Sequence, residues 1–255
     1  MRFLLIALAV AGCSSRGPVV LTPRVEPDAH VPDYARRPFE PWSRTNVVAI
    51  ALREWRAFGS VVDDGPPRAE PATRADNEPG LWQRVGDYWW GLDAGRPETG
   101  LTPRYDAFGN SHVGPAPAWS AAFISYVMRV AGAGPAFPYS ALHADYINAA
   151  ARGALGLSAE RVDQYAPAPG DLVCAPRGAA VGLRFEDLPA PAFTAHCDIV
   201  VAASGRELTV VGGNVGASVT MRHVPVAAGL IAPGGRVLDG RADWFVVLRV
   251  RSGGG

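Results

Sequence analysis

The hydrophobic pattern of the chain changes its period once, near Pro169, and this change limits the possible folds more than any other feature. Before Pro169, apolar side chains recur at the three- and four-residue spacing of helices. After it, short runs rich in β-branched residues alternate with turns, as is typical of strands. Helices followed by strands indicate an α+β domain, in which an N-terminal helical part packs on an antiparallel sheet of about five strands.

Four helices and five strands are expected from this pattern. The predicted helices cover roughly residues 43–59, 81–92, 119–131 and 140–153. The predicted strands cover residues 171–174, 196–202, 207–211, 218–224 and 244–250. The stretch 175–195, between the first two strands, is long for a hairpin connection, so we expect it to form a flap beside a cleft.

The first thirteen residues have the pattern of a secretion signal. Arg2 precedes an apolar run from Phe3 to Ala11 that is too short to span a bilayer as a permanent helix. The end of the run, Val10-Ala11-Gly12-Cys13, resembles a bacterial lipobox. This resemblance implies that residues 1–12 are a lipoprotein signal peptide and that Cys13 carries the lipid; a tail that is not cleaved is the alternative. Ser14, in place of an aspartate, implies the outer membrane and its periplasmic face.

Residues 13–42 are rich in proline and lack apolar periodicity, so we expect a tether between the membrane and a single domain over residues 43–252. The 24 basic and 24 acidic residues give a net charge of zero. Without a basic run, nucleic acid is not expected as a partner. The histidines and cysteines lack the spacing of zinc ligands, so neither a metal nor a cofactor is expected.

Four short motifs stand in an informative order along the chain: Ala118-Trp119-Ser120-Ala121-Ala122-Phe123, Pro169-Gly170-Asp171, His196-Cys197-Asp198-Ile199-Val200 and Gly212-Gly213-Asn214. The order resembles that of the papain-like cell-wall hydrolases of the NlpC and CHAP type. The residues of the first and third motifs also resemble those of the domain-of-unknown-function family 2272. The resemblance implies a papain-like fold, with a nucleophile at the start of a helix and a histidine and a polar residue on the following strands. The chain departs from the pattern in one respect, because Ser120 stands where the family has cysteine.

The resemblance assigns Ser120 as the nucleophile and His196 as its base. A serine hydroxyl is too weak an acid to ionise at a helix N-terminus, so it needs a histidine as a general base. Asn214 would orient the imidazole of His196, and Asp198, two residues further along the same strand face, is the rival. Each residue also has an ordinary interpretation: His196 as a surface residue, and Asn214 as part of a glycine-rich turn.

Trp119 and His143 are candidate substrate contacts beside Ser120. A histidine in a capped first helical turn is commonly a surface residue. Cys174 and Cys197 form an even pair in an oxidising compartment, and either a disulfide or two buried thiols fits the sequence. The resemblance implies that their segments pair as neighbouring antiparallel strands.

Two functions fit these observations. The first is a lipid-anchored periplasmic hydrolase of amide or peptide bonds, with cell-wall peptidoglycan as the expected substrate and the bacterial membrane as a partner through Cys13. The second is a catalytically inactive lipoprotein of the same fold that binds cell-wall or protein ligands, because replacing cysteine by serine is also a way to lose activity.

Overall fold

The computed structural model describes residues 42–65, 75–92, 103–105, 111–113 and 118–251. The expected signal peptide, the lipidated Cys13 and the tether as far as residue 41 lie outside these ranges. Within them, no helix is both long enough and apolar enough to cross a membrane.

All four predicted helices are present. They are α2 (Arg44–Ala57), α3 (Leu81–Trp90), α4 (Ser120–Val130) and α5 (His143–Ala151). The N-terminus of α2 is capped by Ser43, whose Oγ accepts the Asn46 N–H at 3.0 Å. The start of α5 differs from the prediction, because Leu142 is its N-cap and Ser140 Oγ instead donates to the carboxylate of Asp145 at 2.5 Å.

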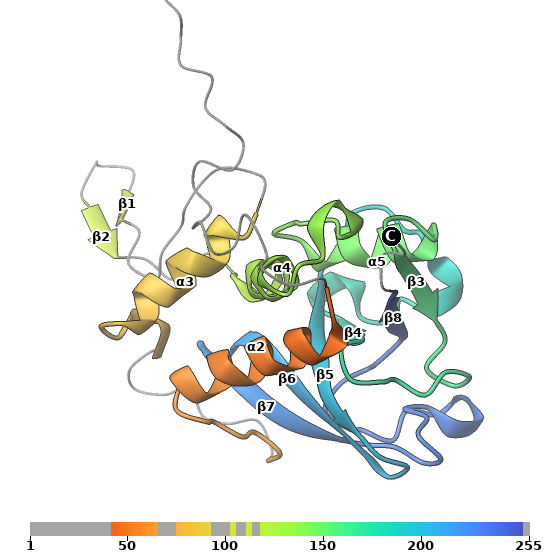
Figure 1. Cartoon of the computed structure of the whole chain (residues 1–255). Helices are drawn as coiled ribbons and strands as arrows, with labels where there is room; N and C mark the ends of the chain where they lie inside the picture. The colour runs from red at the N-terminus through yellow and green to blue at the C-terminus, as the bar shows by residue number, and fades with distance from the viewer. Residues whose placement is uncertain (1–41, 66–74, 93–102, 106–110, 114–117, 252–255) are drawn as a thin grey trace, which may run out of the picture.

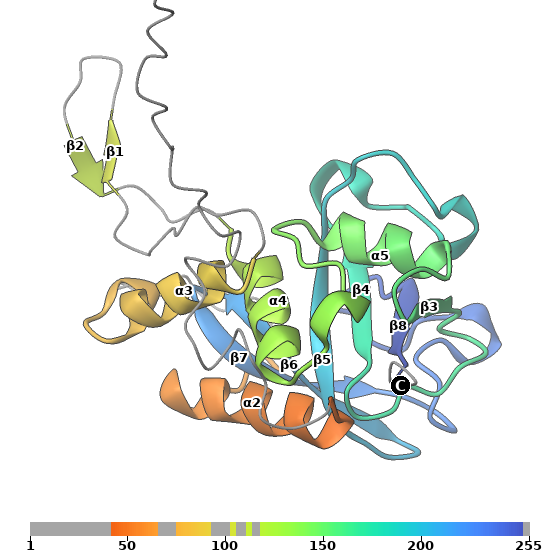
Figure 2. The same ribbon diagram turned by 45° about the horizontal axis from the view of Figure 1, so that its top comes forward.

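The strands form an open antiparallel sheet in the order β3-β8-β4-β5-β6-β7 (Figure 1). Their bounds are β3 Leu157–Glu160, β4 Leu172–Pro176, β5 Ala195–Ala203, β6 Glu207–Val215, β7 Ser218–Pro225 and β8 Val246–Val250. The sequence predicted about five strands and missed β3, because its Ser, Ala and Glu residues are poor strand formers. A separate hairpin, β1 (Pro103–Tyr105) with β2 (Ser111–Val113), lies apart from this sheet in both ribbon views (Figure 2).

The helices form a layer on one face of the sheet. Helices α2 and α4 pack against β5 and β6, α5 packs against β3 and β8, and α3 packs on α4 (Figure 2). The main core fills the space between these layers, with Phe123, Ile147 and Ile199 fully buried in it. The opposite face of the sheet carries a smaller core around Val200, covered by the segment that contains Trp244.

The register of β4 on β5 places Cys174 opposite Cys197, and the two cysteines form a disulfide with their Cα atoms 4.1 Å apart. Both cysteines are fully buried on the helix side of the sheet. The adjacent pair in the register is Ala175 with His196. The bridge therefore lies directly beside a candidate site residue.

The stretch predicted as a flap is a folded loop that is fastened to α5. It contains two short 3₁₀ turns, η3 (Gly178–Ala180) and η4 (Phe185–Asp187). The side-chain amide of Asn148 on α5 donates to the carbonyl of Ala190 at 2.9 Å and accepts its N–H at 2.9 Å. Because of this double contact, the loop keeps a fixed position above the start of β5.

Candidate functional site

Ser120 is the first residue of α4. Trp119, its N-cap, provides no side-chain acceptor for the first turn, and the first hydrogen bond along the helix runs from Phe123 N–H to the Trp119 carbonyl at 2.9 Å. The N–H groups of Ser120, Ala121 and Ala122 therefore have no acceptor within the helix. They give this end of α4 a partial positive charge that stabilises an anion.

The hydroxyl of Ser120 forms a hydrogen bond with His143, with 2.8 Å between Oγ and Nε2. Helix packing accounts for this contact, because the Tyr146 hydroxyl on α5 donates to the Ala121 carbonyl at 2.6 Å and lies 2.6 Å from Ser125 Oγ on α4. The first residues of the two helices are thereby brought together. The contact predicted between Ser120 and His196 is replaced by this one.

His143 is buried, with an exposed fraction of 5%, and so is not the solvated surface residue that was the alternative interpretation. Burial lowers the pKa of His143 well below the usual histidine value, and His196 and Arg177 lower it further, while Asp198 opposes them. The imidazole is therefore neutral at pH 7. Its Nδ1 is buried and has no hydrogen-bond partner among the residues that the structure describes. In the described part of the chain, no carboxylate orients this histidine, in contrast to the usual arrangement beside a nucleophile.

His196 lies next to His143, with 5.3 Å between the ring centroids and 62° between the planes. Its exposed fraction is 2%, and its Nε2 lies 2.7 Å from Oδ1 of Asp198. Burial lowers the pKa of His196, although the charge and hydrogen bond of Asp198 partly offset that effect. A neutral His196 must donate from Nε2 to this carboxylate, which leaves Nδ1 as an acceptor.

Asp198 is fully buried and forms an ion pair with Arg222 of β7. Burial alone would raise the pKa of Asp198, but Arg222 and His196 lower it more strongly, so the carboxylate stays ionised. The guanidinium of Arg222 lies over the Trp244 ring, 5.2 Å from its centroid. Of the two predicted orienters of His196, it is thus Asp198 that hydrogen-bonds to it.

The two glycines of the Gly-Gly-Asn motif are required by close packing. A Cβ atom at Gly212 would lie 1.9 Å from Oδ1 of Asp198, and one at Gly213 would lie 2.6 Å from Cβ of Phe123. Gly212 therefore leaves room for the His196–Asp198 pair, while Gly213 lets β6 approach the first turn of α4.

Asn214 follows these glycines at a bulge in β6, with a φ of 57° that belongs to the left-handed region. Within the described part of the chain, its side chain makes no hydrogen bond to His196.

Trp119, which was predicted to contact substrate, has no exposed surface. Its Nε1 donates to Oδ2 of the buried Asp76 at 3.0 Å. Trp119 is therefore a core residue, and the prediction that it contacts substrate is wrong.

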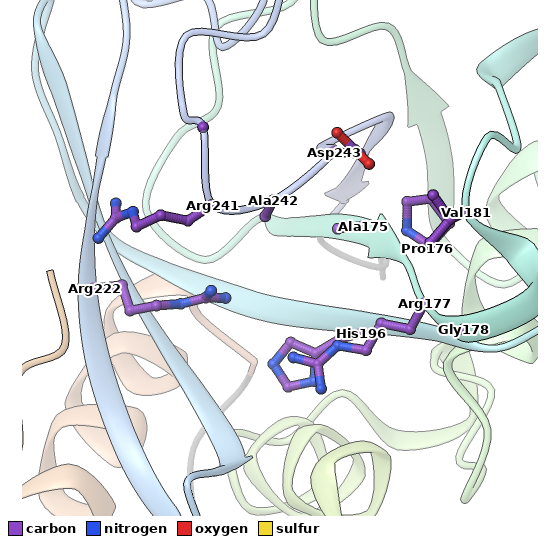
Figure 3. Close-up of a pocket in the computed structure, with 11 residues that line it drawn as sticks. Ala175, Pro176, Arg177, Gly178, Val181, His196, Arg222, Arg241, Ala242 and Asp243 are labelled. Carbon is purple, nitrogen blue, oxygen red and sulfur yellow. The ribbon is translucent and has the colours of Figure 1, made fainter. Parts of the chain in front are cut away.

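A pocket of about 320 Å³ lies beside His196, which is one of its lining residues (Figure 3). Arg177 and Val181 of the loop, Arg222 of β7, and Arg241 are among the residues that line it. The sequence motifs pointed to none of these arginines. Over the described ranges, no group of histidines, cysteines and carboxylates could hold a metal ion.

Comparison with known proteins adds one match. The sequence model of a family described as "Uncharacterized protein conserved in bacteria (DUF2272)" matches residues 76–250, which contain every residue of the site. No curated protein and no solved structure matches the chain.

Proposed function

Because the chain belongs to the bacterial DUF2272 family, with most of its length covered by that family, we propose a function that its own side chains support: hydrolysis of an amide or peptide bond with Ser120 as the nucleophile. The observation that carries the proposal is the 2.8 Å contact between Ser120 Oγ and a neutral, buried histidine. The site differs from the sequence-based proposal in its base, which is His143 instead of His196.

The reaction begins when Ser120 Oγ attacks the carbonyl carbon of the amide and its proton passes to Nε2 of His143. The negative charge that develops on the carbonyl oxygen is stabilised by the N–H groups in the first turn of α4 that have no acceptor within the helix. Protonated His143 then gives its proton to the leaving amine as the C–N bond breaks. Water attacks the resulting ester with His143 as its base, which releases the acid and restores the Ser120 hydroxyl.

His196 and Asp198 support the base in this proposal. When His143 accepts the proton of Ser120, its Nδ1 carries a hydrogen that needs an acceptor. The Nδ1 of His196 is such an acceptor, on a ring whose centroid lies 5.3 Å from that of His143. The ionised Asp198 fixes His196 in the tautomer with a free Nδ1, so it serves as the orienting carboxylate of a two-histidine relay.

The substrate class follows from the compartment and from the resemblance to papain-like cell-wall hydrolases. The helix, strand and glycine motifs that suggested a papain-like fold lie around one site, and we retain that fold assignment as part of the proposal. With a lipid on Cys13 and an outer-membrane location, the domain faces peptidoglycan, whose stem peptides contain amide bonds. Replacing Cys13 with Ala should move the protein out of the membrane fraction; retention in the membrane would argue against the lipid anchor.

The direct test is to incubate the full chain, purified in detergent, with peptidoglycan and to identify the products by mass spectrometry. New amine and carboxyl ends should appear, and Ser120→Ala should abolish them while the thermal unfolding temperature stays close to that of the wild type, because alanine is tolerated in a first helical turn. Products that persist with Ser120→Ala would exclude Ser120 as the nucleophile.

Ser120→Cys tests the surroundings of the nucleophile separately from any substrate. The helix N-terminus and His143 should make the new thiol more acidic than an ordinary one and quick to react with iodoacetamide at pH 7. Ala203→Cys, at the exposed end of β5, is the matched control. Equal rates for the two thiols would favour the alternative function, a binding protein without catalytic activity. The unpartnered Nδ1 of His143 is the observation that supports that alternative.

A further inference from the structure

The pocket beside His196 carries positive charge on the side that faces this histidine. Arg177 and Arg222 extend toward His196 from two directions, while the guanidinium of Arg241 turns away from it (Figure 3). Asp243 is the only carboxylate among the lining residues, and it stands at the opposite wall. The pocket is therefore electrostatically asymmetric.

Two of the three arginines already have acidic partners. Arg222 is paired with Asp198, and Nε of Arg241 lies 2.9 Å from Oδ1 of Asp239. The side chain of Arg177 is different, because it makes neither a hydrogen bond nor an ion pair with any residue that the structure describes. Only its backbone is bonded, with its N–H donating to the Thr194 carbonyl at 3.0 Å. Beside the neutral imidazole there is thus a guanidinium that no described carboxylate contacts directly, although the charge of Asp198 attracts it.

We propose that this pocket binds a carboxylate group, with Arg177 as its main contact, and that this carboxylate belongs to the substrate cleaved at Ser120. The second half of the statement rests on the proposed function. A guanidinium matches the planar carboxylate with two parallel N–H···O bonds. One free positive charge, faced by Asp243 across the pocket, suits a single negative charge better than the nearly doubly charged phosphate group. A volume of about 320 Å³ accommodates the end of a peptide.

The bound carboxylate would also act on the base. The positive charge of Arg177 lowers the pKa of both His143 and His196, after burial as the larger cause. A carboxylate on Arg177 cancels part of that charge, so both pKa values should rise when the ligand binds. His143 would become a stronger base only when a substrate is present, which links recognition to the reaction at Ser120.

The test is an NMR titration of the full chain in detergent, observing the Nε–H signal of Arg177 and the C2–H signals of the histidines. Two probes carry a carboxylate: N-acetylalanine has it at the chain terminus, and N-acetylglutamate with an amidated α-carboxyl has it on the side chain. N-acetylalanine amide, which has no carboxylate, and inorganic phosphate are the other two probes. At least one carboxylate should bind, and the tighter of the two identifies the position of the acid in the substrate. Arg177→Gln should weaken that binding at least about tenfold.

Arg206→Gln is the matched control, because Arg206 is an exposed arginine in the turn at the far end of β5 from His196. It should bind the carboxylates as the wild type does. Three results would each overturn the carboxylate site. The amide could bind as strongly as the acid, phosphate could bind more tightly than either carboxylate, or Arg177→Gln could bind the carboxylate as the wild type does. Ser120→Ala should keep the binding. If it binds the carboxylate but the wild type cleaves nothing, the proposed hydrolysis fails while the pocket assignment stands.

Discussion

The two histidines of the site are equally buried and almost in contact, yet their surroundings are opposite. His143 begins a helix, and the one polar partner it has among the described residues is the uncharged hydroxyl of Ser120. His196 lies on a central strand and is bonded to a carboxylate, which is paired in turn with Arg222. Charge is therefore concentrated at one end of the site, and the nucleophile stands at the other.

The site thus has a helix half, Ser120 with His143, and a strand half, His196 with Asp198, and different interactions position each of them. The Ser120–His143 contact depends on the packing of α5 against α4 through Tyr146. The position of His196 depends on the strand register and on the buried ion pair of Asp198. Substitutions of Ser120 or His143 should then act mainly on catalysis, and substitutions of His196 or Asp198 should act mainly on stability, with a smaller effect on catalysis.

The largest effect is expected from replacing each histidine with glutamine. His143→Gln removes the base and should lower kcat/KM at least about 10³-fold. His196→Gln can still donate to Asp198, so its loss should be roughly tenfold or less, about 1.4 kcal/mol in the barrier. Hydrolysis kinetics on peptidoglycan fragments measure both. Equal losses would mean that the two histidines act as one catalytic unit, and a larger loss for His196→Gln would restore the base assignment made from the sequence.

Next in size is the effect of Asp198→Asn on folding. The substitution leaves the buried Arg222 without its counter-charge, so the free energy of unfolding should fall by about 3–5 kcal/mol. Asp163→Asn removes the same charge from a solvent-accessible pair with Arg161 and should change the stability little. Urea unfolding of the three proteins gives the comparison. If Asp198→Asn is as stable as Asp163→Asn, the strand half is not held by charge.

A smaller effect is expected from Gly212→Ala. The added Cβ would lie 1.9 Å from Oδ1 of Asp198 and 3.0 Å from Nε2 of His196, so the pair must shift. The cost should be about 1–3 kcal/mol of unfolding free energy, as for other overpacked interiors. Gly205→Ala, which meets nothing within 4 Å, is the control and should be neutral. Because Gly212 contacts the strand half, the iodoacetamide reactivity of Ser120→Cys should survive in the Gly212→Ala background; its loss would show that the halves are coupled.

The smallest effect is that of pH near neutrality. The pKa of His143 lies well below 6.5, so the base is neutral and kcat/KM should be constant between about pH 6.5 and 8. In acid, the unfolded chain binds protons that the buried histidines do not, so the free energy of unfolding should fall as the pH drops below about 6.5. His143→Gln should reduce that slope in urea unfolding at several pH values. A kcat/KM that still rises between pH 6.5 and 8 would contradict a neutral His143.

The sequence predicted the fold better than it predicted the site, for a physical reason. Local periodicity in the sequence indicates helices and strands, and it predicted all four helices and the five longer strands of the main sheet. The strand β3 was not predicted, because it lacks β-branched residues and its position is set by pairing with β8.

The site depends on contacts between distant segments, which a single sequence does not show. The order of motifs predicted one site containing Ser120, His196 and Asp198, whereas the hydrogen-bond partner of Ser120 is His143. His143 is brought there by the packing of Tyr146, a residue that looks like an ordinary apolar position of α5. The glycines of the fourth motif indicated a turn, whereas the structure requires them because a Cβ atom at either position would clash with neighbouring side chains. The role of Arg222 had one available signal: it shares a strand face with Thr220 and Val224, which are both buried.

The disulfide between Cys174 and Cys197 has a consequence for variation within this fold. The bridge closes the intervening loop into a covalent ring and prevents β5 from sliding along β4. Since a slip of one residue would turn His196 to the opposite face, the ring separates two tasks. The loop, which carries Arg177, can change in length and composition to suit a different ligand, while the histidine at its base keeps its place.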